Sequence, residues 1–198
     1  AGYEIAGFVW FHGFNDLIKG AGVFPDYTHA LTCLINDVRK DLDTPKMPFV
    51  IGVMGISGPN ADGKQVQFRK AQEAPAALPE FAGNVAAVRT EHCWDMEWVK
   101  ISAKPKDTLT PDEQKFMQTA TSNEGFHYMG SAYTYSMIGK AFAEAMAKMI
   151  DDYALDGVVF HPIKSCRTVS TGLADNRRAL MALRDVPSLF IESDMMDK

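Results

Sequence analysis

The chain has 198 residues, a formal net charge of −5 and an isoelectric point near 5.5. Proteins hold nucleic acid largely through Lys and Arg contacts to phosphates, so an acidic chain of this kind argues against a nucleic-acid partner. Hydrophobic residues make up 46% and charged residues 23%, which suits a globular protein that buries a core. No apolar run approaches the roughly 20 residues of a membrane span, so we expect no membrane partner.

The first half of the chain alternates strand-like and helical segments. The stretch GFVWFHGFNDL, residues 7–17, predicts an apolar strand that ends in a Gly-x-Asn-Asp turn, and residues 25–48 contain a helix with apolar positions at helical spacing. The run FVIGVMG at 49–55 is typical of a strand covered on both faces. After a loop and a short helix around 68–77, VAAVRT at 85–90 predicts another strand. This alternation predicts a mostly parallel α/β sandwich.

The second half continues the pattern. Residues 92–123 mix loop with short helices, and a long amphipathic helix begins at Ser131. Its apolar stripe has the period of a helix lying on a sheet: Tyr135, Ile138, Phe142, Ala145 and Met149. Strand-like runs at 156–162 and 188–194, with a helical segment between them, predict a short C-terminal βαβ unit.

Polar and permissive residues follow the opening strand directly: His12, Gly13, Asn15 and Asp16. In a parallel α/β sheet, reactive groups collect at the carboxyl ends of strands. An Asn amide in this position can donate to an oxyanion, with help from a glycine backbone N–H. The alternative for the Asn-Asp pair is an ordinary turn.

A second chemical stretch is SNEGFHYMGSA, residues 122–132, in which Glu124 precedes His127 by three residues. A carboxylate at that spacing can reach the near ring nitrogen of the imidazole, fix its tautomer and leave the other nitrogen as a general base. The alternative is a histidine that caps or packs. Base, orienting acid and oxyanion donor are three of the four parts of a serine esterase, and the missing part is the nucleophile.

Ser57, in VMGISGP, follows a strand between glycines and is the positional candidate for a nucleophile. It makes no Gly-x-Ser-x-Gly elbow, so we expect a loop of the substrate pocket instead. Two interpretations are open for Arg69 and Gln72: their side chains point toward that pocket, or they lie on a surface helix. Core packing is expected for Trp10, and two further tryptophans could line a sugar site: Trp94 and Trp98.

Five stretches spread over residues 1–148 carry a resemblance to a known family: YEIAGFVWFHGFNDL, MPFVIGVMGISG, FRKAQEAPAALPEF, NVAAVRTEHCWDMEW and HYMGSAYTYSMIGKAFAEAM. Together they resemble the sialate O-acetylesterase-type domain of the SGNH hydrolase superfamily. The resemblance implies an incomplete flavodoxin-like three-layer sandwich, a serine esterase mechanism without a cofactor, and an acetylated carbohydrate as substrate. Related esterases are often exported, which implies a periplasmic or extracellular parent domain. The compartment and oligomeric state of this chain stay open.

The resemblance places the Gly13–Asp16 turn in a block that contributes to oxyanion binding. It matches His127 to the catalytic histidine and Glu124 to a position usually held by aspartate, while His12 stands where the family often has glutamine. The family's Gly-Gln-Ser-Asn nucleophile block is absent. We interpret the chain as beginning downstream of that block, and expect little or no esterase activity from it alone.

Residues 150–198 carry a second resemblance. The marks DGVVFH, SCR and VPSLFIESDMMD resemble the 2-hydroxyacyl-CoA dehydratase and benzoyl-CoA reductase subunit family, which implies an iron–sulfur ligand at Cys166. Thiolate ligation needs several converging cysteines, whereas Cys33 and Cys93 belong to a segment without such a role. We therefore expect a plain thiol and no metal site, with the cluster as the alternative.

The two resemblances divide the chain into a partial esterase-like domain at 1–149 and a dehydratase-like fragment at 150–198. We interpret this as a composite or truncated chain, with a natural fusion as the alternative. The principal functional hypothesis is a carbohydrate O-acetylesterase domain. Two alternatives stay open: a fragment of a dehydratase iron–sulfur subunit, and a carbohydrate-binding module without catalysis.

Overall fold

The fold is built on a small parallel sheet. The computed structural model describes residues 5, 7–153, 158–160, 178, 181–182 and 188–190. Three parallel strands pair in the order β1 (Phe8–Trp10), β2 (Phe49–Val53) and β3 (Val85–Arg89). Because all three strands run the same way, their carboxyl ends meet at one edge of the sheet.

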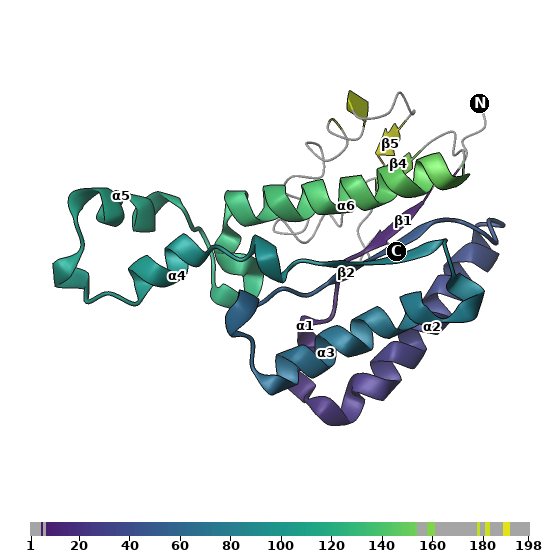
Figure 1. Ribbon diagram of the computed structural model, residues 1–198, viewed down its shortest axis with the longest axis horizontal. Coiled ribbons are helices and arrows are strands. Elements are labelled where there is room, and N and C mark those ends of the chain that lie inside the picture. The colour runs from purple at the N-terminus through teal and green to yellow at the C-terminus, as the bar shows by residue number, and fades with distance from the viewer. Residues whose placement is uncertain are drawn as a thin grey trace, which may run out of the picture.

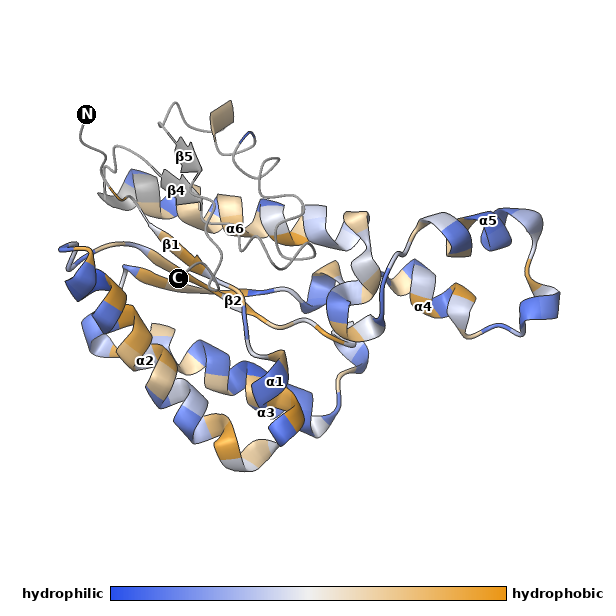
Figure 2. Ribbon diagram, turned by 180° about the vertical axis from the view of Figure 1, so that it is seen from behind, coloured by the Kyte–Doolittle hydropathy of each residue, from blue (hydrophilic) through white to orange (hydrophobic). Residues whose placement is uncertain are grey.

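Helices cover both faces of this sheet (Figure 1). Helices α2 (Phe24–Asp41) and α3 (Gly63–Glu73) lie on one face, and the long helix α6 (Ala132–Tyr153) lies on the other. Every residue of β2 is buried, as predicted for a strand covered on both faces. Figure 2 shows the apolar strands between the helices. The α/β sandwich with a parallel sheet is therefore confirmed, in an incomplete form.

Local sequence signals account for most helix boundaries. Helix α3 begins with a capping box between Asp62 and Gln65, which places its start earlier than the sequence prediction of residue 68. On α6, Ile138, Phe142 and Met149 are buried against the sheet, as the apolar stripe predicts. Short 3₁₀ helices connect the main elements: Ala21–Val23, Gly58–Asn60, Ala74–Ala77, Pro79–Phe81, Glu91–Cys93, Lys106–Thr108 and Gly125–Gly130. None of the described helices is long and apolar enough to cross a bilayer.

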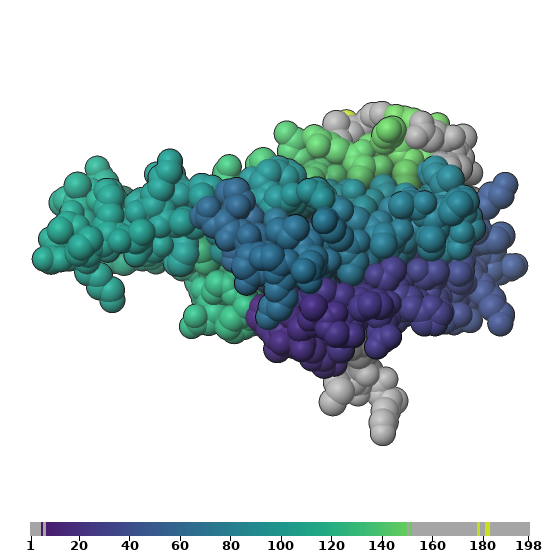
Figure 3. Space-filling model, turned by 60° about the horizontal axis from the view of Figure 1, so that its bottom comes forward, coloured from purple at the N-terminus to yellow at the C-terminus, as the bar shows by residue number. Residues whose placement is uncertain are grey.

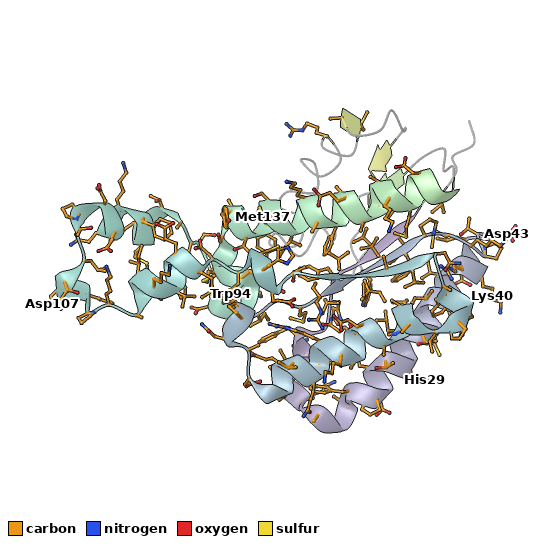
Figure 4. The ribbon with its side chains drawn as sticks, viewed as in Figure 1. His29, Lys40, Asp43, Trp94, Asp107 and Met137 are labelled. Atoms are coloured by element: carbon orange, nitrogen blue, oxygen red, sulfur yellow. The ribbon has the colours of Figure 1, made fainter. Side chains whose placement is uncertain are left out.

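The segment after β3 forms an arm. Helices α4 (Met96–Ser102) and α5 (Pro111–Thr119) project together from the body of the protein, as the ribbon and the space-filling view both show (Figures 1 and 3). Asp95 caps α4, and an ion pair of 2.5 Å between Lys104 Nζ and Glu113 Oε1 links the two sides of the arm. In Figure 4, Trp94 lies where the arm meets the body and Asp107 lies at its far end.

The C-terminal part contains a second sheet of two strands. Strands β4 (Val158–Phe160) and β5 (Ser188–Phe190) pair in parallel, with Val158 opposite Ser188. Parallel neighbours need a crossover connection, which is what the predicted βαβ unit supplies. Residues 178 and 181–182 are helical, and the rest of the connection, including Cys166, lies outside the described residues. Helix α6 runs through the proposed domain boundary at 149/150, and that boundary stays a prediction.

Candidate functional site

Two loops follow the carboxyl ends of β1 and β2, and the side chain of Gln72 joins them. Its Oε1 accepts from the backbone N–H of Met54 at 2.9 Å, and its Nε2 donates to the carbonyl of His12 at 2.9 Å. The hydroxyl of Tyr27 donates to the same carbonyl at 2.9 Å. Gln72 is fully buried, so the surface-helix interpretation is wrong for this residue.

Arg69, one turn earlier on α3, holds the loop after β2. Its Nε donates to the carbonyl of Met54 at 2.9 Å, and its Nη2 donates to the carbonyls of Ile56 at 2.9 Å and Gly58 at 3.1 Å. Only 7% of the residue is exposed, so it does not lie on a surface helix either. These hydrogen bonds all go to loop backbone, and the predicted contact of Arg69 with substrate stays a prediction.

The loop that carries His127 packs against both of these segments. The buried Tyr128 accepts a hydrogen bond from the backbone N–H of Gly55 at 2.9 Å. The ring of Phe126 stacks on that of Phe14 with centroids 5.4 Å apart. Segments around residues 13, 55 and 127, which are far apart in the sequence, therefore meet at the carboxyl edge of the sheet, which is the edge predicted for the site.

The imidazole of His127 is exposed, and its Nδ1 lies 3.0 Å from Oδ1 of Asn123. The same oxygen accepts from the backbone N–H of Glu124 at 2.8 Å, which agrees with its assignment as the amide oxygen. An oxygen can only accept here, so this contact favours the tautomer with the proton on Nδ1, in which Nε2 is free to accept a proton. The spacing of Glu124 and His127 predicts the carboxylate of Glu124 in this role, whereas the structure shows the amide of Asn123 there. The one signal for Asn123 in the sequence is its position four residues before His127.

The turn after β1 has a conformation that requires glycine. Gly13 has φ 137°, and a Cβ there would meet the ring of Phe68 at 2.7 Å. Its carbonyl accepts from the N–H groups of Asp16 and Leu17, which begins the short helix α1 (Phe14–Lys19) instead of a simple turn. Asn15, the predicted oxyanion donor, is exposed on this helix.

His12 and Asp16 line a groove to which no residue of the His127 loop contributes. The groove has a volume of about 510 Å³ and lies between the end of β1 and α2, where Trp10, Lys19 and Tyr27 also line it. Lys19 Nζ lies 4.0 Å from the Asp16 carboxylate. The groove combines an indole, an imidazole and charges of both signs, and it remains a candidate for substrate contacts.

Burial changes the acid–base chemistry of two groups near the site. Burial raises the pKa of Tyr128 to about 12. Burial, with the nearby charge of Glu91, raises the pKa of the Cys93 thiol to about 11. Both groups are therefore neutral at physiological pH. One carboxylate oxygen of Glu91, Oε2, is buried and has no hydrogen-bond partner among the described residues.

The described cysteines do not form a metal or cluster site. Cys33 is exposed on α2, where its sulfur lies 3.7 Å from Nε2 of His29, while Cys93 is buried beside Trp94 as a neutral thiol. Within the described residues, no group of three or more His, Cys, Asp or Glu side chains could hold a metal ion. Cys166, the predicted cluster ligand, lies outside those residues.

Comparison with known families gives two matches. The model of the carbohydrate esterase, sialic acid-specific acetylesterase family matches residues 1–110, and that of the 2-hydroxyglutaryl-CoA dehydratase, D-component, matches residues 76–198. The two matches overlap at residues 76–110. Neither the curated proteins nor the solved structures gave a match. Each family model covers more than half of the chain, so the protein belongs to the sialic acid-specific carbohydrate esterase family through its N-terminal part and to the 2-hydroxyglutaryl-CoA dehydratase D-component family through its C-terminal part.

Proposed function

We propose that the N-terminal part is a carbohydrate O-acetylesterase site that binds acetylated sugars. The observation that carries this proposal is the meeting of three loops at the carboxyl edge of the sheet, with a histidine on one of them in the tautomer of a general base. The match to the sialic acid-specific esterase family supports the choice of substrate class.

The chemistry would be acyl transfer. A serine hydroxyl attacks the acetyl carbonyl, and His127 Nε2 takes its proton and returns it to the leaving sugar oxygen. Asn123 holds the imidazole in the required tautomer through Nδ1. Gly13 and Asn15 are the proposed donors to the negative oxygen of the tetrahedral intermediate.

The nucleophile is the open component of this mechanism. The 198 residues contain no Gly-Gln-Ser-Asn block. Ser57 follows β2 in the manner of an active-site serine, but its Oγ accepts from Gln65 Nε2 at 3.0 Å and no described contact links it to His127. We therefore expect these residues alone to bind acetylated sugar with little or no turnover.

The test compares acetate release with ligand binding. The purified chain is incubated with p-nitrophenyl acetate and with O-acetylated sialic acid, and binding of acetylated and deacetylated sugar is followed by ligand-observed NMR. We expect selective binding of the acetylated sugar that weakens in His127→Ala but not in His29→Ala, a matched exposed histidine on the outside of α2 (Figure 4). Equal affinity for both sugars would contradict the proposal. Turnover lost in both His127→Ala and Ser57→Ala, together with an acetyl group found on Ser57 by mass spectrometry of the wild-type protein, would identify Ser57 as the nucleophile.

A second candidate function rests on the other family match, over residues 76–198. It is an iron–sulfur subunit fragment of a 2-hydroxyacyl-CoA dehydratase. The described cysteines do not fit such a cluster, because Cys33 and Cys93 lie in different surroundings and the latter is a buried neutral thiol. Anaerobic reconstitution with iron and sulfide tests this candidate. A visible absorption band that disappears in Cys166→Ser but not in Cys33→Ser would support it, and a colourless protein would exclude it.

A further inference from the structure

The loop after β2 contains a tight turn with a strained residue at its third position. The N–H of Gly58 donates to the carbonyl of Gly55 at 2.8 Å, and between them Ser57 has φ 67° and ψ 0°. This is the third position of a type II turn, which glycine normally occupies because a side chain disfavours positive φ. Such strain persists only where the surrounding structure holds it in place.

Arg69 provides that hold, and it also decides where one backbone N–H points. Its Nη2 donates to the carbonyl of Ile56 at 2.9 Å. In a planar trans peptide the carbonyl and the following N–H point in opposite directions, so the N–H of Ser57 is directed away from the guanidinium. No residue in the described part of the chain accepts a hydrogen bond from this N–H.

The hydroxyl of Ser57 adds a second donor. Its Oγ accepts from Gln65 Nε2 at 3.0 Å, and Gln65 is itself held by the capping box with Asp62. No described residue receives the hydroxyl hydrogen, so it stays available. The half-buried Ser57 therefore offers two hydrogen-bond donors, one from its backbone and one from its side chain.

The charge beneath the turn favours a negatively charged ligand. Arg69 is 7% exposed, its hydrogen bonds go to three neutral carbonyls, and no carboxylate among the described residues pairs with it. A buried cation that lacks an anionic partner stabilises negative charge placed nearby. The Ile56–Ser57 peptide group points its carbonyl at the Arg69 guanidinium. Its N–H, the positive end of the peptide dipole, points the opposite way, toward the side on which a ligand would bind.

We propose that the backbone N–H and the hydroxyl of Ser57 bind an acyl oxygen, either of a carboxylate or of an ester carbonyl, and that Arg69 is the positioning residue for this pair. Gly55, two residues earlier, is hydrogen-bonded to Tyr128 next to His127, so the pair lies at the same edge as the proposed base. The inference rests on the esterase function for the identity of the ester. The binding of an acyl oxygen can be measured independently.

The test follows the Ser57 amide of ¹⁵N-labelled protein during titration with sodium acetate and, separately, with methyl acetate. We expect a saturable shift of this amide with acetate. A response to both probes means that the pair takes acyl carbonyls, and a response to acetate alone means that it takes carboxylates. No saturable shift of the Ser57 amide with either probe would overturn the proposal.

Three variants separate the roles. His29→Ala, at an exposed histidine on α2, should leave the acetate response unchanged. The acetate shift of the Ser57 amide requires no ester turnover, so its failure and the failure of the esterase proposal are measured separately. Ser57→Gly keeps the turn and the N–H but lacks the hydroxyl, so we expect several-fold weaker binding. Arg69→Lys should bind at least tenfold more weakly and should lose the strong HN–Hα NOE within Ser57 that positive φ produces. Wild-type acetate affinity in a folded Arg69→Lys protein, or in Ser57→Gly, would refute the assigned roles.

Discussion

The replacement Gln72→Leu tests whether the two strand-end loops depend on one buried amide. The substitution keeps a side chain of similar size and removes both hydrogen-bonding groups. The carbonyl of His12 keeps a donor, because Tyr27 also bonds to it. The N–H of Met54 loses its only described partner, because that partner is Gln72 Oε1. Met54 is 7% exposed, so solvent does not readily replace the lost hydrogen bond.

These contacts set the expected magnitude. A buried N–H left without a partner costs about 1–3 kcal/mol, and the lost bond to His12 adds about 1 kcal/mol. We therefore expect Gln72→Leu to lower the free energy of unfolding by about 2–4 kcal/mol. The assay is equilibrium unfolding in urea. We expect the midpoint to fall while the dependence of the unfolding free energy on urea concentration (the m-value) stays the same.

The same helix provides a matched control. Gln67 on α3 is exposed, so Gln67→Leu should change the free energy of unfolding by less than about 0.5 kcal/mol. Gln72→Glu gives a second check. Its carboxylate still accepts from the N–H of Met54, but when charged it is buried and its other oxygen is repelled by the His12 carbonyl. Its folded-state pKa should lie above the unfolded value, so the variant should lose stability as the pH rises through that interval. Equal stability of Gln72→Leu and Gln67→Leu would refute the bridging role.

Two further predictions concern buried acids. Because burial raises the pKa of the Cys93 thiol to about 11, iodoacetamide at pH 8 should modify Cys33 in the folded protein and leave Cys93 unmodified until denaturant is added, as peptide mapping would show. Comparable labelling of both would contradict the assigned burial. Tyr128 has a raised pKa of about 12 against an ordinary value of 10.0, so its stabilising contribution is complete below pH 10 and is lost between pH 10 and about 12. Ultraviolet difference titration of the native protein, compared with Tyr128→Phe, should assign to Tyr128 a tyrosinate that forms only near pH 12, and its formation near pH 10 would refute the burial argument.

Much of the architecture follows from the sequence alone. The continuous apolar run at 49–55 predicts a strand covered on both faces, and β2 is buried along its whole length. The apolar stripe that begins at Tyr135 predicts the face of α6 that packs on the sheet. These predictions hold because the period of buried residues is a local property of each segment. The two family resemblances are likewise carried by local motifs, and both family models match the chain.

The partners at the candidate site required the tertiary structure. Spacing alone could not choose between Glu124 and Asn123 for the imidazole of His127, because the loop has positive φ at Tyr128 and Met129, a backbone path that no periodicity encodes. Polarity alone suggested that Arg69 and Gln72 face solvent or substrate, yet both are buried. The two side chains bond to backbone groups beyond the ends of β1 and β2 that have no partner within the sheet. Those backbone groups come next to α3 only when the sheet forms. Local sequence thus determines which segments become helices and strands, whereas long-range packing determines which polar groups meet.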